Sequence, residues 1–310
     1  MMISASRRTD IPAFYSEWFF NRLREGQVLA PNPYDPGRLG YVELSPKNVD
    51  CIVLWTKNPV PMLDKFRKLD DMGYRYCVHF TLTPYGKDIE RNLPPKPKLL
   101  QAFREMSERI GIERSVWRYD PILVDAEHSV EWHLDRFGRM CDVLHDRTER
   151  CFLSFVDPYK GLDDRFRALT ENEMKDIASG FSDIAKAHDI KLFTCAEKAD
   201  LSQYGIEHGA CIDQRLIERI VGYRITAKKD ADQRTECRCI ESVDIGAYDT
   251  CAHGCSYCYA VSNGDTAMRR MAAHDVDSPV ITGHPRGDET ITDRTKGPQR
   301  DEQTDLLRYM

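Results

Sequence analysis

The sequence predicts an α/β protein with a parallel sheet, and two observations carry this prediction. Short apolar runs rich in β-branched and aromatic residues alternate with segments of helical spacing. This alternation favours parallel strands joined by right-handed crossovers. Polar residues follow each apolar run, as they do at the ligand-binding mouth of a barrel. We therefore expect a partial (β/α) barrel of about six parallel strands, with an open doubly wound sheet as the alternative.

The expected strands are short runs bounded by polar or proline-containing turns. They lie at residues 3–6, 51–56, 76–82, 115–119, 152–156 and 191–195. Apolar residues recur at helical spacing between them, at residues 14–23, 62–69, 99–110 and 174–184. Strand and helix thus alternate along this part of the chain.

The segments after these strands carry side chains suited to ligand binding. They read SRRTD at 6–10, WTKNP at 55–59, FTLTPY at 80–85, WRYDP at 117–121, FVDPYKG at 155–161 and CAEK at 195–198. Because the carboxyl ends of parallel strands share one edge, we expect these residues to line one polar cavity. Ordinary solvated turns are the alternative.

The candidate residues for this cavity are assigned either to binding a cofactor or to catalysis. Arg and Lys suit a carboxylate, whereas Asp and Glu suit hydroxyl groups. The expected cofactor-binding residues are Arg7, Arg8, Asp10, Lys57, His79, Asp157 and Tyr257. The expected catalytic residues are Arg118, Tyr119, Asp120 and Glu197. His79 is equally compatible with a hydrogen-bonded core histidine, and each charged residue with an ion pair.

Three cysteines lie on one short segment. The sequence DIGAYDTCAHGCSYCYA, residues 244–260, places Cys251, Cys255 and Cys258 at Cys-x3-Cys-x2-Cys spacing. Three thiolates can bind three corners of a 4Fe–4S cluster, which leaves the fourth iron without a protein ligand. Gly254 allows the loop to turn tightly beside the middle cysteine. Zinc is the alternative, but zinc usually takes a closed set of four ligands.

The other cysteines fall into two groups. One group could hold a second iron–sulfur cluster or a four-cysteine zinc site, with buried inert thiols as the alternative: Cys195, Cys211, Cys237 and Cys239. The second group lies within apolar strands or a helix face and is expected in the core: Cys51, Cys77, Cys141 and Cys151.

The Cys-x3-Cys-x2-Cys motif, with an aromatic residue before its last cysteine, resembles the signature of the radical S-adenosylmethionine superfamily. The whole chain resembles an uncharacterised bacterial domain-of-unknown-function family that carries the motif near its C-terminal end, from SRRTD through CAEK to HDVDSP at 274–279. Because the superfamily normally carries its cysteines after the first barrel strand, the resemblance implies a permuted partial barrel. The superfamily's glycine-glycine-glutamate stretch has no clear counterpart here.

The resemblance implies a radical enzyme. A reduced 4Fe–4S cluster would cleave S-adenosylmethionine, and the 5′-deoxyadenosyl radical would attack an unknown substrate. Tyr257 would lie near the adenine, and a reductant such as ferredoxin or flavodoxin would supply the electron. The alternative is an iron–sulfur protein for electron transfer or structure, without S-adenosylmethionine chemistry.

Composition limits the partners and the compartment. The formal net charge of −6 gives no general attraction for polyphosphate, so a nucleic-acid substrate would need a local basic patch. The sequence shows no secretion signal and no apolar run of about 20 residues, so we expect a cytoplasmic protein without a membrane partner. In a reducing compartment, 11 cysteines favour metal or redox chemistry over disulfides.

Three regions follow from the change in pattern along the chain. Residues 1–222 form the expected barrel, residues 223–263 a cysteine-rich iron–sulfur region packed on it, and residues 264–310 a polar tail or strap. Apolar periodicity is weak beyond residue 223, and the chain after Asn263 is polar with scattered Gly and Pro.

Overall fold

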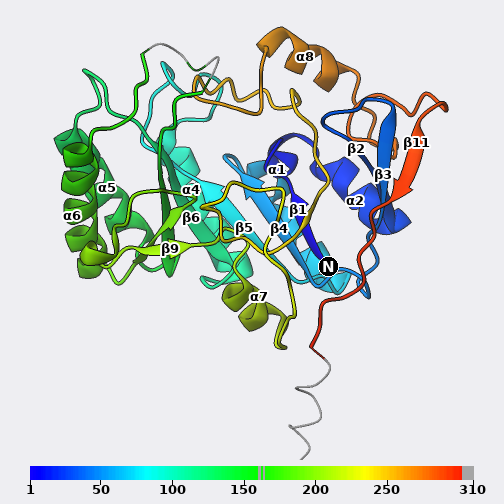
Figure 1. Ribbon diagram of the computed structural model, residues 1–310, viewed down its shortest axis with the longest axis horizontal. Coiled ribbons are helices and arrows are strands. Elements are labelled where there is room, and N and C mark those ends of the chain that lie inside the picture. Colours follow the sequence, from blue (N-terminus) through cyan, green and yellow to red (C-terminus); the bar gives the residue numbers. More distant parts are fainter. Residues whose placement is uncertain (160–161, 163–164, 302–310) are drawn as a thin grey trace, which may run out of the picture.

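A computed structural model of the chain describes residues 1–159, 162 and 165–301 (Figure 1). Its centre is an eight-stranded parallel sheet in the order β10-β1-β4-β5-β6-β7-β8-β9. The prediction of an α/β fold is confirmed. Among the described residues, no helix is long and apolar enough to cross a membrane.

The six predicted strands are all present in the main sheet. They are β1 (Met2–Ala5), β4 (Cys51–Thr56), β5 (Tyr76–Thr81), β6 (Ser115–Ile122), β7 (Arg150–Phe155) and β8 (Lys191–Cys195). The two edge strands, β9 (Glu207–Gly209) and β10 (Val243–Asp244), were not predicted because they are too short to show a period. Nor was the small sheet formed by β2 (Gln27–Pro31), β3 (Arg38–Glu43) and β11 (Thr290–Asp293).

Helical structure is present at the four predicted segments, residues 14–23, 62–69, 99–110 and 174–184, and further helices occur elsewhere. The helices are α1 (Ile11–Phe14), α2 (Ser16–Glu25), α3 (Phe66–Asp71), α4 (Lys96–Ile110), α5 (Val130–Leu144), α6 (Glu171–Ala187), α7 (Gln214–Val221) and α8 (Gly264–Ala272), with 3-10 turns η1 (Val60–Lys65) and η2 (Ser202–Tyr204). Capping side chains fix several starts. Thr170 and Glu173 form a reciprocal capping box at α6, and Ser129 caps α5.

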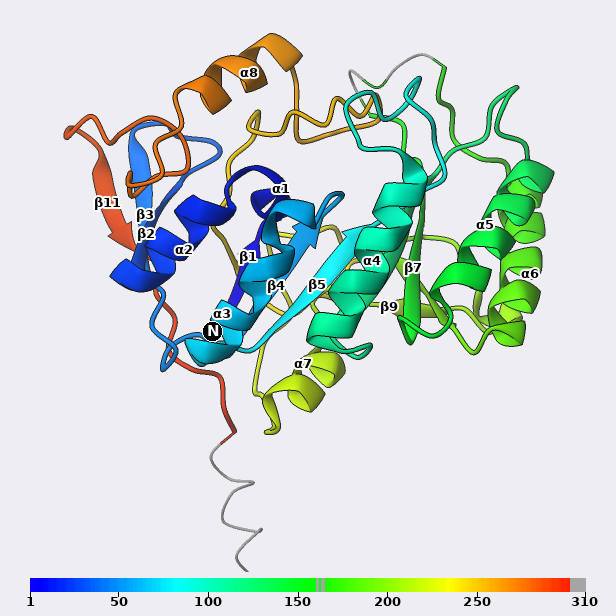
Figure 2. The ribbon, with the colours of Figure 1, turned by 180° about the vertical axis from the view of Figure 1, so that it is seen from behind.

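The central strands of the main sheet bury alternate side chains on its two faces. In β4, Ile52 and Leu54 pack in the large core that includes α1 to α6, and we call this side the helical face. Cys51 and Val53 point the other way, into a smaller core with α7 and residues 223–240, and we call this side the cysteine face. Figures 1 and 2 show the two sides: α7 lies in front in the first view, and α3 and α4 lie in front in the second.

The order of the strands follows the order of the chain from β1 to β8. Right-handed crossovers in a constant direction place the connecting helices on one face, and the helices between β1 and β8 share one core. The sheet has two free edges, because the described residues show no pairing between β9 and β10. The parallel α/β sheet is therefore open in its hydrogen bonding rather than a closed barrel.

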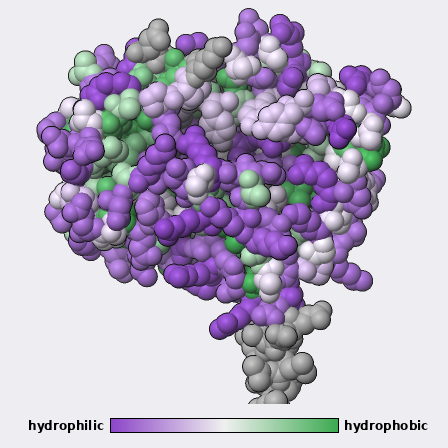
Figure 3. Space-filling model, in the orientation of Figure 1, coloured by the Kyte–Doolittle hydropathy of each residue, from purple (hydrophilic) through white to green (hydrophobic). Residues whose placement is uncertain are grey.

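The segment predicted as a polar tail or strap lies against the N-terminal elements (Figure 1). Its strand β11 pairs with β3, and the indole Nε1 of Trp18 donates to the Ser278 carbonyl at 2.9 Å. The backbone N–H of Gln299 donates to Asp50 at 2.9 Å. Residues 302–310 lie outside the described part of the chain. The face seen in Figure 3 is mainly hydrophilic, with scattered hydrophobic areas.

Candidate metal centre

The cysteine motif lies on a loop that follows β10. Ile3 and Ser4 of β1 pair in parallel with Val243 and Asp244 of β10. The Asp244 carboxylate fixes the start of the loop, because it accepts hydrogen bonds from the hydroxyls of Ser4 at 2.9 Å and Ser6 at 2.6 Å. The loop thus leaves the sheet at the carboxyl edge, beside the ends of β1, β4 and β5.

The three thiols of the loop are near enough to interact electrostatically, and each residue is partly buried. Burial raises the pKa of every one of them, to about 12 for Cys255. Backbone N–H groups oppose this effect at two sulfurs: His253 donates to Cys251, and Ala260 and Val261 donate to Cys258. Amide donors aimed at cysteine sulfur suit thiolates that bind an iron–sulfur cluster.

Gly254 makes the turn that separates the first two thiols. Its φ of +66° is left-handed, as predicted for a tight turn beside Cys255. A Cβ at this position would meet Asn92 Nδ2 at 3.1 Å and Arg91 Cβ at 3.4 Å. The loop therefore fits closely on the segment after β5 only with glycine here.

Asp10, a predicted cofactor ligand, anchors the cysteine loop instead. One carboxylate oxygen accepts from His253 Nε2 at 2.7 Å and from the backbone N–H of Lys57 at 2.7 Å. The other oxygen caps α1 by accepting from the N–H of Ala13 at 3.0 Å. Both oxygens are thus engaged in joining β1, β4 and the loop.

Glu90 is a buried site residue that sequence reasoning missed. Its carboxylate accepts hydrogen bonds from four side chains: Lys57, Thr83, Lys96 and Tyr257. Burial alone would raise the pKa of Glu90, but Lys57 and Lys96 lower it to about 2. Its backbone pairs with Cys255. An acidic residue in a loop gives no sequence signal for this role, so only the fold identifies it.

Lys57 and Tyr257 are both predicted to bind cofactor. Lys57 lies beside the cysteine loop, and Tyr257 is part of it. The Lys57 ammonium is 5.2 Å from the centre of the Tyr257 ring and 2.8 Å from Glu90. Arg8 also lies near the loop, with its guanidinium 5.3 Å from the centre of the Tyr248 ring.

The second cysteine group also comes together, on the cysteine face of the sheet. Cys195 Sγ and Cys211 Sγ are 2.7 Å apart, and Cys239 makes thiol contacts with both Cys211 and Cys237. The guanidinium of Arg118 donates to Cys211 Sγ at 2.6 Å. A strand end, the start of α7 and a late loop thus supply four sulfurs to one place.

Arg7 and Arg118 belong to this second group rather than to the motif loop. Arg7 interacts most strongly with Cys239 and Cys211, and its guanidinium lies 5.3 Å from the Trp55 ring. Arg118, predicted as catalytic, is buried and lies at the same distance, 5.3 Å, from that ring.

His79 is buried on the cysteine face and stacks on Trp55 at 4.6 Å. Neither ring nitrogen has a hydrogen-bond partner among the described residues. Burial and the nearby Arg118 lower the pKa of His79 well below its usual value, so the ring is neutral. A histidine without partners is not the hydrogen-bonded core residue considered from the sequence.

Three acidic candidates lie at the ends of β6, β7 and β8. Asp120 forms an ion pair with Arg118, and Asp157 pairs with Arg234 at the surface. Glu197 accepts the backbone N–H of Phe155 at 2.7 Å. Burial raises the pKa of Glu197 to about 7, so this carboxyl exchanges a proton near neutral pH. Lys160 and Gly161 of the FVDPYKG segment lie outside the described residues.

Tyr119 is the one predicted catalytic residue that points away from the cysteine face. Its ring packs against Phe137 and Phe181 on the helical face, and its hydroxyl hydrogen-bonds His133 Nδ1 at 2.8 Å. Neighbouring residues of a strand face opposite ways, so Tyr119 cannot join Arg118 and Asp120. The cysteines predicted as core residues are buried, as expected: Cys51, Cys77, Cys141 and Cys151.

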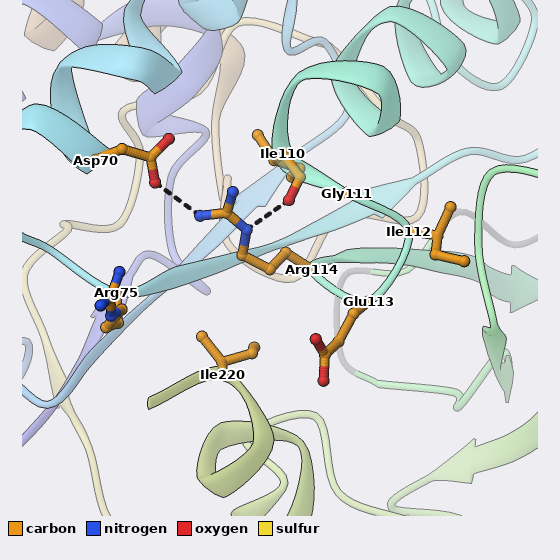
Figure 4. A pocket seen from close by; sticks show the side chains of 8 residues that line it. All are labelled: Asp70, Arg75, Ile110, Gly111, Ile112, Glu113, Arg114 and Ile220. Carbon is orange, nitrogen blue, oxygen red and sulfur yellow. Dashed lines mark hydrogen bonds and ion pairs between the residues drawn. The ribbon is translucent and has the colours of Figure 1, made fainter. Parts of the chain in front are cut away.

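A separate pocket of about 410 Å³ lies at the amino ends of β5 and β6 (Figure 4). Arg114 spans it and pairs with Asp70 at 2.8 Å, and Arg75, Glu113 and Ile220 also line it. None of the predicted site residues lines this pocket. It lies at the edge of the sheet opposite to the motif loop.

The fold and the site together define a class: an α/β protein whose parallel sheet carries a three-cysteine loop at its carboxyl edge. The chain belongs to the family described as Domain of unknown function (DUF1848), which it matches over residues 2–260. No curated protein matches it. Among solved structures, it is similar to a putative alpha-L-fucosidase from Bacteroides thetaiotaomicron, at 10% identity and a TM-score of 0.26 over 74% of this chain and 82% of that one.

Proposed function

We propose that this protein is a radical S-adenosylmethionine enzyme with an unknown substrate. The observation that carries the proposal is the place of the cysteine loop in the sheet. The loop follows β10, and β10 is the edge strand beside β1. In the superfamily that the motif resembles, the cysteines follow the first barrel strand. Strand β10 lies beside β1 at the edge of the sheet although it comes late in the chain, and this supports a permutation as the reason for the late motif.

We also infer that the main sheet corresponds to a permuted partial barrel. A doubly wound sheet reverses its winding and carries helices on both faces. Here the strands from β1 to β8 add in one direction, and α1 to α6 share the helical face. This single direction of winding is typical of (β/α) barrels.

The residues of the loop fit a 4Fe–4S cluster. Cys251, Cys255 and Cys258 supply three thiolates, and the backbone N–H groups described above donate to two of these sulfurs. When bound, such a cluster with one open iron supplies the electron that cleaves S-adenosylmethionine to a 5′-deoxyadenosyl radical. A one-electron reductant such as ferredoxin or flavodoxin, in the cytoplasm, would serve this reaction.

The residues around the loop have distinct tasks in this proposal. Asp10 and Glu90 hold the loop through His253 and Tyr257. Glu197, with a pKa of about 7, holds or releases a proton at its carboxyl group for a substrate bound at the ends of β7 and β8. The negative charge of the nearby Asp120 helps to raise the pKa of Glu197.

Cleavage of the cofactor tests the proposal directly. The anaerobically reconstituted full chain is reduced with dithionite and given S-adenosylmethionine, and 5′-deoxyadenosine is measured by chromatography. We expect product from the wild type and none from Cys251→Ala. Cys141→Ala is the matched control, because Cys141 is a buried cysteine on α5 within the helical core.

Two results would contradict the proposal. The first is an intact cluster in the wild type with no 5′-deoxyadenosine or other cleavage product, which would favour an iron–sulfur protein for electron transfer or structure. The second is equal product from Cys251→Ala and the control.

A further inference from the structure

We propose that a second iron–sulfur cluster binds on the cysteine face, held by Cys195, Cys211, Cys237 and Cys239. This site is separate from the motif loop, and the inference does not depend on S-adenosylmethionine chemistry. Four features of the site support it: the convergence of the sulfurs, the charge around them, the unpartnered polar nitrogens near them and the spacing between them.

The four sulfurs converge from segments far apart in the sequence. Cys195 ends β8, Cys211 precedes α7, and the Cys-x-Cys pair lies in the long loop before β10. Cys211, Cys237 and Cys239 are at most 6% exposed. Thiols drawn from such distant segments into one buried place are typical of a metal site.

The charge around the site suits bound thiolates. Four thiolates place a large negative charge in a buried region, which needs nearby cations. Arg118 donates to Cys211 Sγ at 2.6 Å and is 6% exposed. Arg7 interacts with Cys239 and Cys211 from the end of β1. The backbone N–H of Ile212 donates to Cys239 Sγ at 3.4 Å.

Two buried side chains at this site leave polar nitrogens without a partner among the described residues. They are Arg7, at Nη2, and His79, whose neutral ring has one N–H donor and one acceptor nitrogen. A buried donor without a hydrogen bond costs about 1–3 kcal/mol. The inorganic sulfides of a cluster are acceptors, and a sulfide can accept the one N–H that a neutral imidazole carries. A bare tetrahedral zinc ion offers no acceptor of its own.

The spacing of the sulfurs also favours a cluster over one zinc ion. Zinc–sulfur bonds of about 2.3 Å in a tetrahedron place all the sulfurs about 3.8 Å from one another. Within the described part of the chain, no three of these four sulfurs lie mutually within 4.8 Å. Only neighbours in the series Cys195, Cys211, Cys239 and Cys237 are in contact. The series is more extended than the ligand set of one zinc ion. The 2.7 Å between Cys195 and Cys211 is shorter than either kind of centre requires, so these two thiols separate when a metal centre binds.

A closed ligand set gives this cluster a role different from that of the motif cluster. All four ligands come from the protein, so no iron is left open for a cofactor or substrate. Residues 223–240 have little regular structure, and Cys237 and Cys239 join them to the ends of the sheet and α7. The second cluster therefore transfers electrons and holds this segment on the cysteine face.

Iron and sulfide content, measured on variants of the full chain, tests the second site. The variant Cys251→Ala/Cys255→Ala/Cys258→Ala removes the motif ligands, and we expect it to retain about four irons and four sulfides per chain. Adding Cys237→Ser/Cys239→Ser should remove them. The matched control adds Cys141→Ser and Cys151→Ser to the motif variant instead, and should keep the iron.

The wild type provides a measurement that does not depend on how the variants fold. We expect about eight irons per chain there if both clusters form. Circular dichroism of each variant shows whether it is folded. A folded motif variant without iron would overturn the second cluster while leaving the proposed function intact. About one zinc per chain, lost with Cys237 and Cys239, would also overturn it, as would a Cys195–Cys211 disulfide in iron-free protein.

Discussion

Glu90 shows how one buried side chain organises the candidate site. It is 1% exposed and joins β4, the loop after β5, α4 and the cysteine loop through its hydrogen-bond donors. Burying a carboxylate is costly unless cations and donors replace water. Lys57 and Lys96 provide those cations, which is why the pKa of Glu90 falls to about 2 rather than rising.

Glu90→Gln should destabilise the protein by roughly 3–5 kcal/mol at pH 7, because it leaves two ammonium groups facing each other without the carboxylate. Chemical denaturation of the apo protein measures this free energy. The matched control is Glu171→Gln, whose side chain is 83% exposed and should change stability little. An equal effect of the two substitutions would show that Glu90 does not organise the site.

Glu197 should give the protein a pH-dependent stability of its own. Its pKa is raised from 4.5 to about 7 in the folded state. The stability that this group contributes is therefore fully present below pH 4.5 and is lost as the pH rises through 7. The loss amounts to about 3 kcal/mol, since each unit is worth about 1.4 kcal/mol.

Glu197→Gln should remove this pH dependence and keep the hydrogen bond from Phe155, because the amide oxygen also accepts. Thermal unfolding at pH 5 and pH 8 measures the effect: the variant should lose less stability than the wild type. Glu17→Gln, an exposed change on α2, should leave the wild-type pH dependence in place. If both variants behave like the wild type, the raised pKa is wrong.

At the scale of elements, the cysteine loop is held from both sides. His253, between the first two cysteines, bonds Asp10 at the end of β1. Asn92, after β5, donates its side-chain N–H to the Ala252 carbonyl at 2.8 Å. The same side chain packs closely on Gly254 and leaves no room for a Cβ there. The loop is thus fixed before any metal binds, which lowers the conformational cost of binding.

Gly254→Ala should weaken metal retention by the loop. A left-handed backbone costs a non-glycine residue about 1–2 kcal/mol, and the new Cβ would press on Asn92. We expect the full-length variant to lose iron to a chelator faster than the wild type, as measured by absorption. This difference in rate should not depend on the salt concentration. Gly264→Ala is the control, because its Cβ would meet nothing within 4 Å. Equal rates for both variants would argue against a role for the turn.

The sequence predicted those strands and helices that are long enough to show a periodic pattern of apolar residues. Strands β4 and β8 have the predicted bounds, and α4 and α6 lie where apolar residues recur at helical spacing. Strand β10 has only two residues, so its pattern carries no information. Strand β10 forms because the edge of β1 is free to pair with residues 243 and 244. The position of that edge depends on the whole fold.

At the scale of the molecule, the C-terminal segment completes the N-terminal part. Strand β11 pairs with β3, and the backbone N–H of Leu29 donates to the Pro279 carbonyl at 2.9 Å. The fully buried carboxylate of Asp50 pairs with the N-terminal amine and accepts from Gln299. Residues more than 200 positions apart thus share one hydrogen-bonded surface.

A chain that ends at residue 263 should be much less stable than one that ends at residue 301. The shorter chain exposes Trp18 and the edge of β3, and it leaves the buried Asp50 with one donor fewer. We expect a lower midpoint of thermal unfolding, by more than about 5 °C. Equal midpoints for the two chains would show that the segment adds no stability.

The sequence by itself determined the α/β class, the six central strands and the two groups of cysteines, because these depend on local periods, composition and spacing. Only the tertiary structure decided which side chains meet. Tyr119 lies on the helical face because neighbours in a strand alternate. Arg7 and Arg118 reach the second cysteine group, and Glu90 joins the first. These meetings depend on the register of distant strands, which no local pattern encodes.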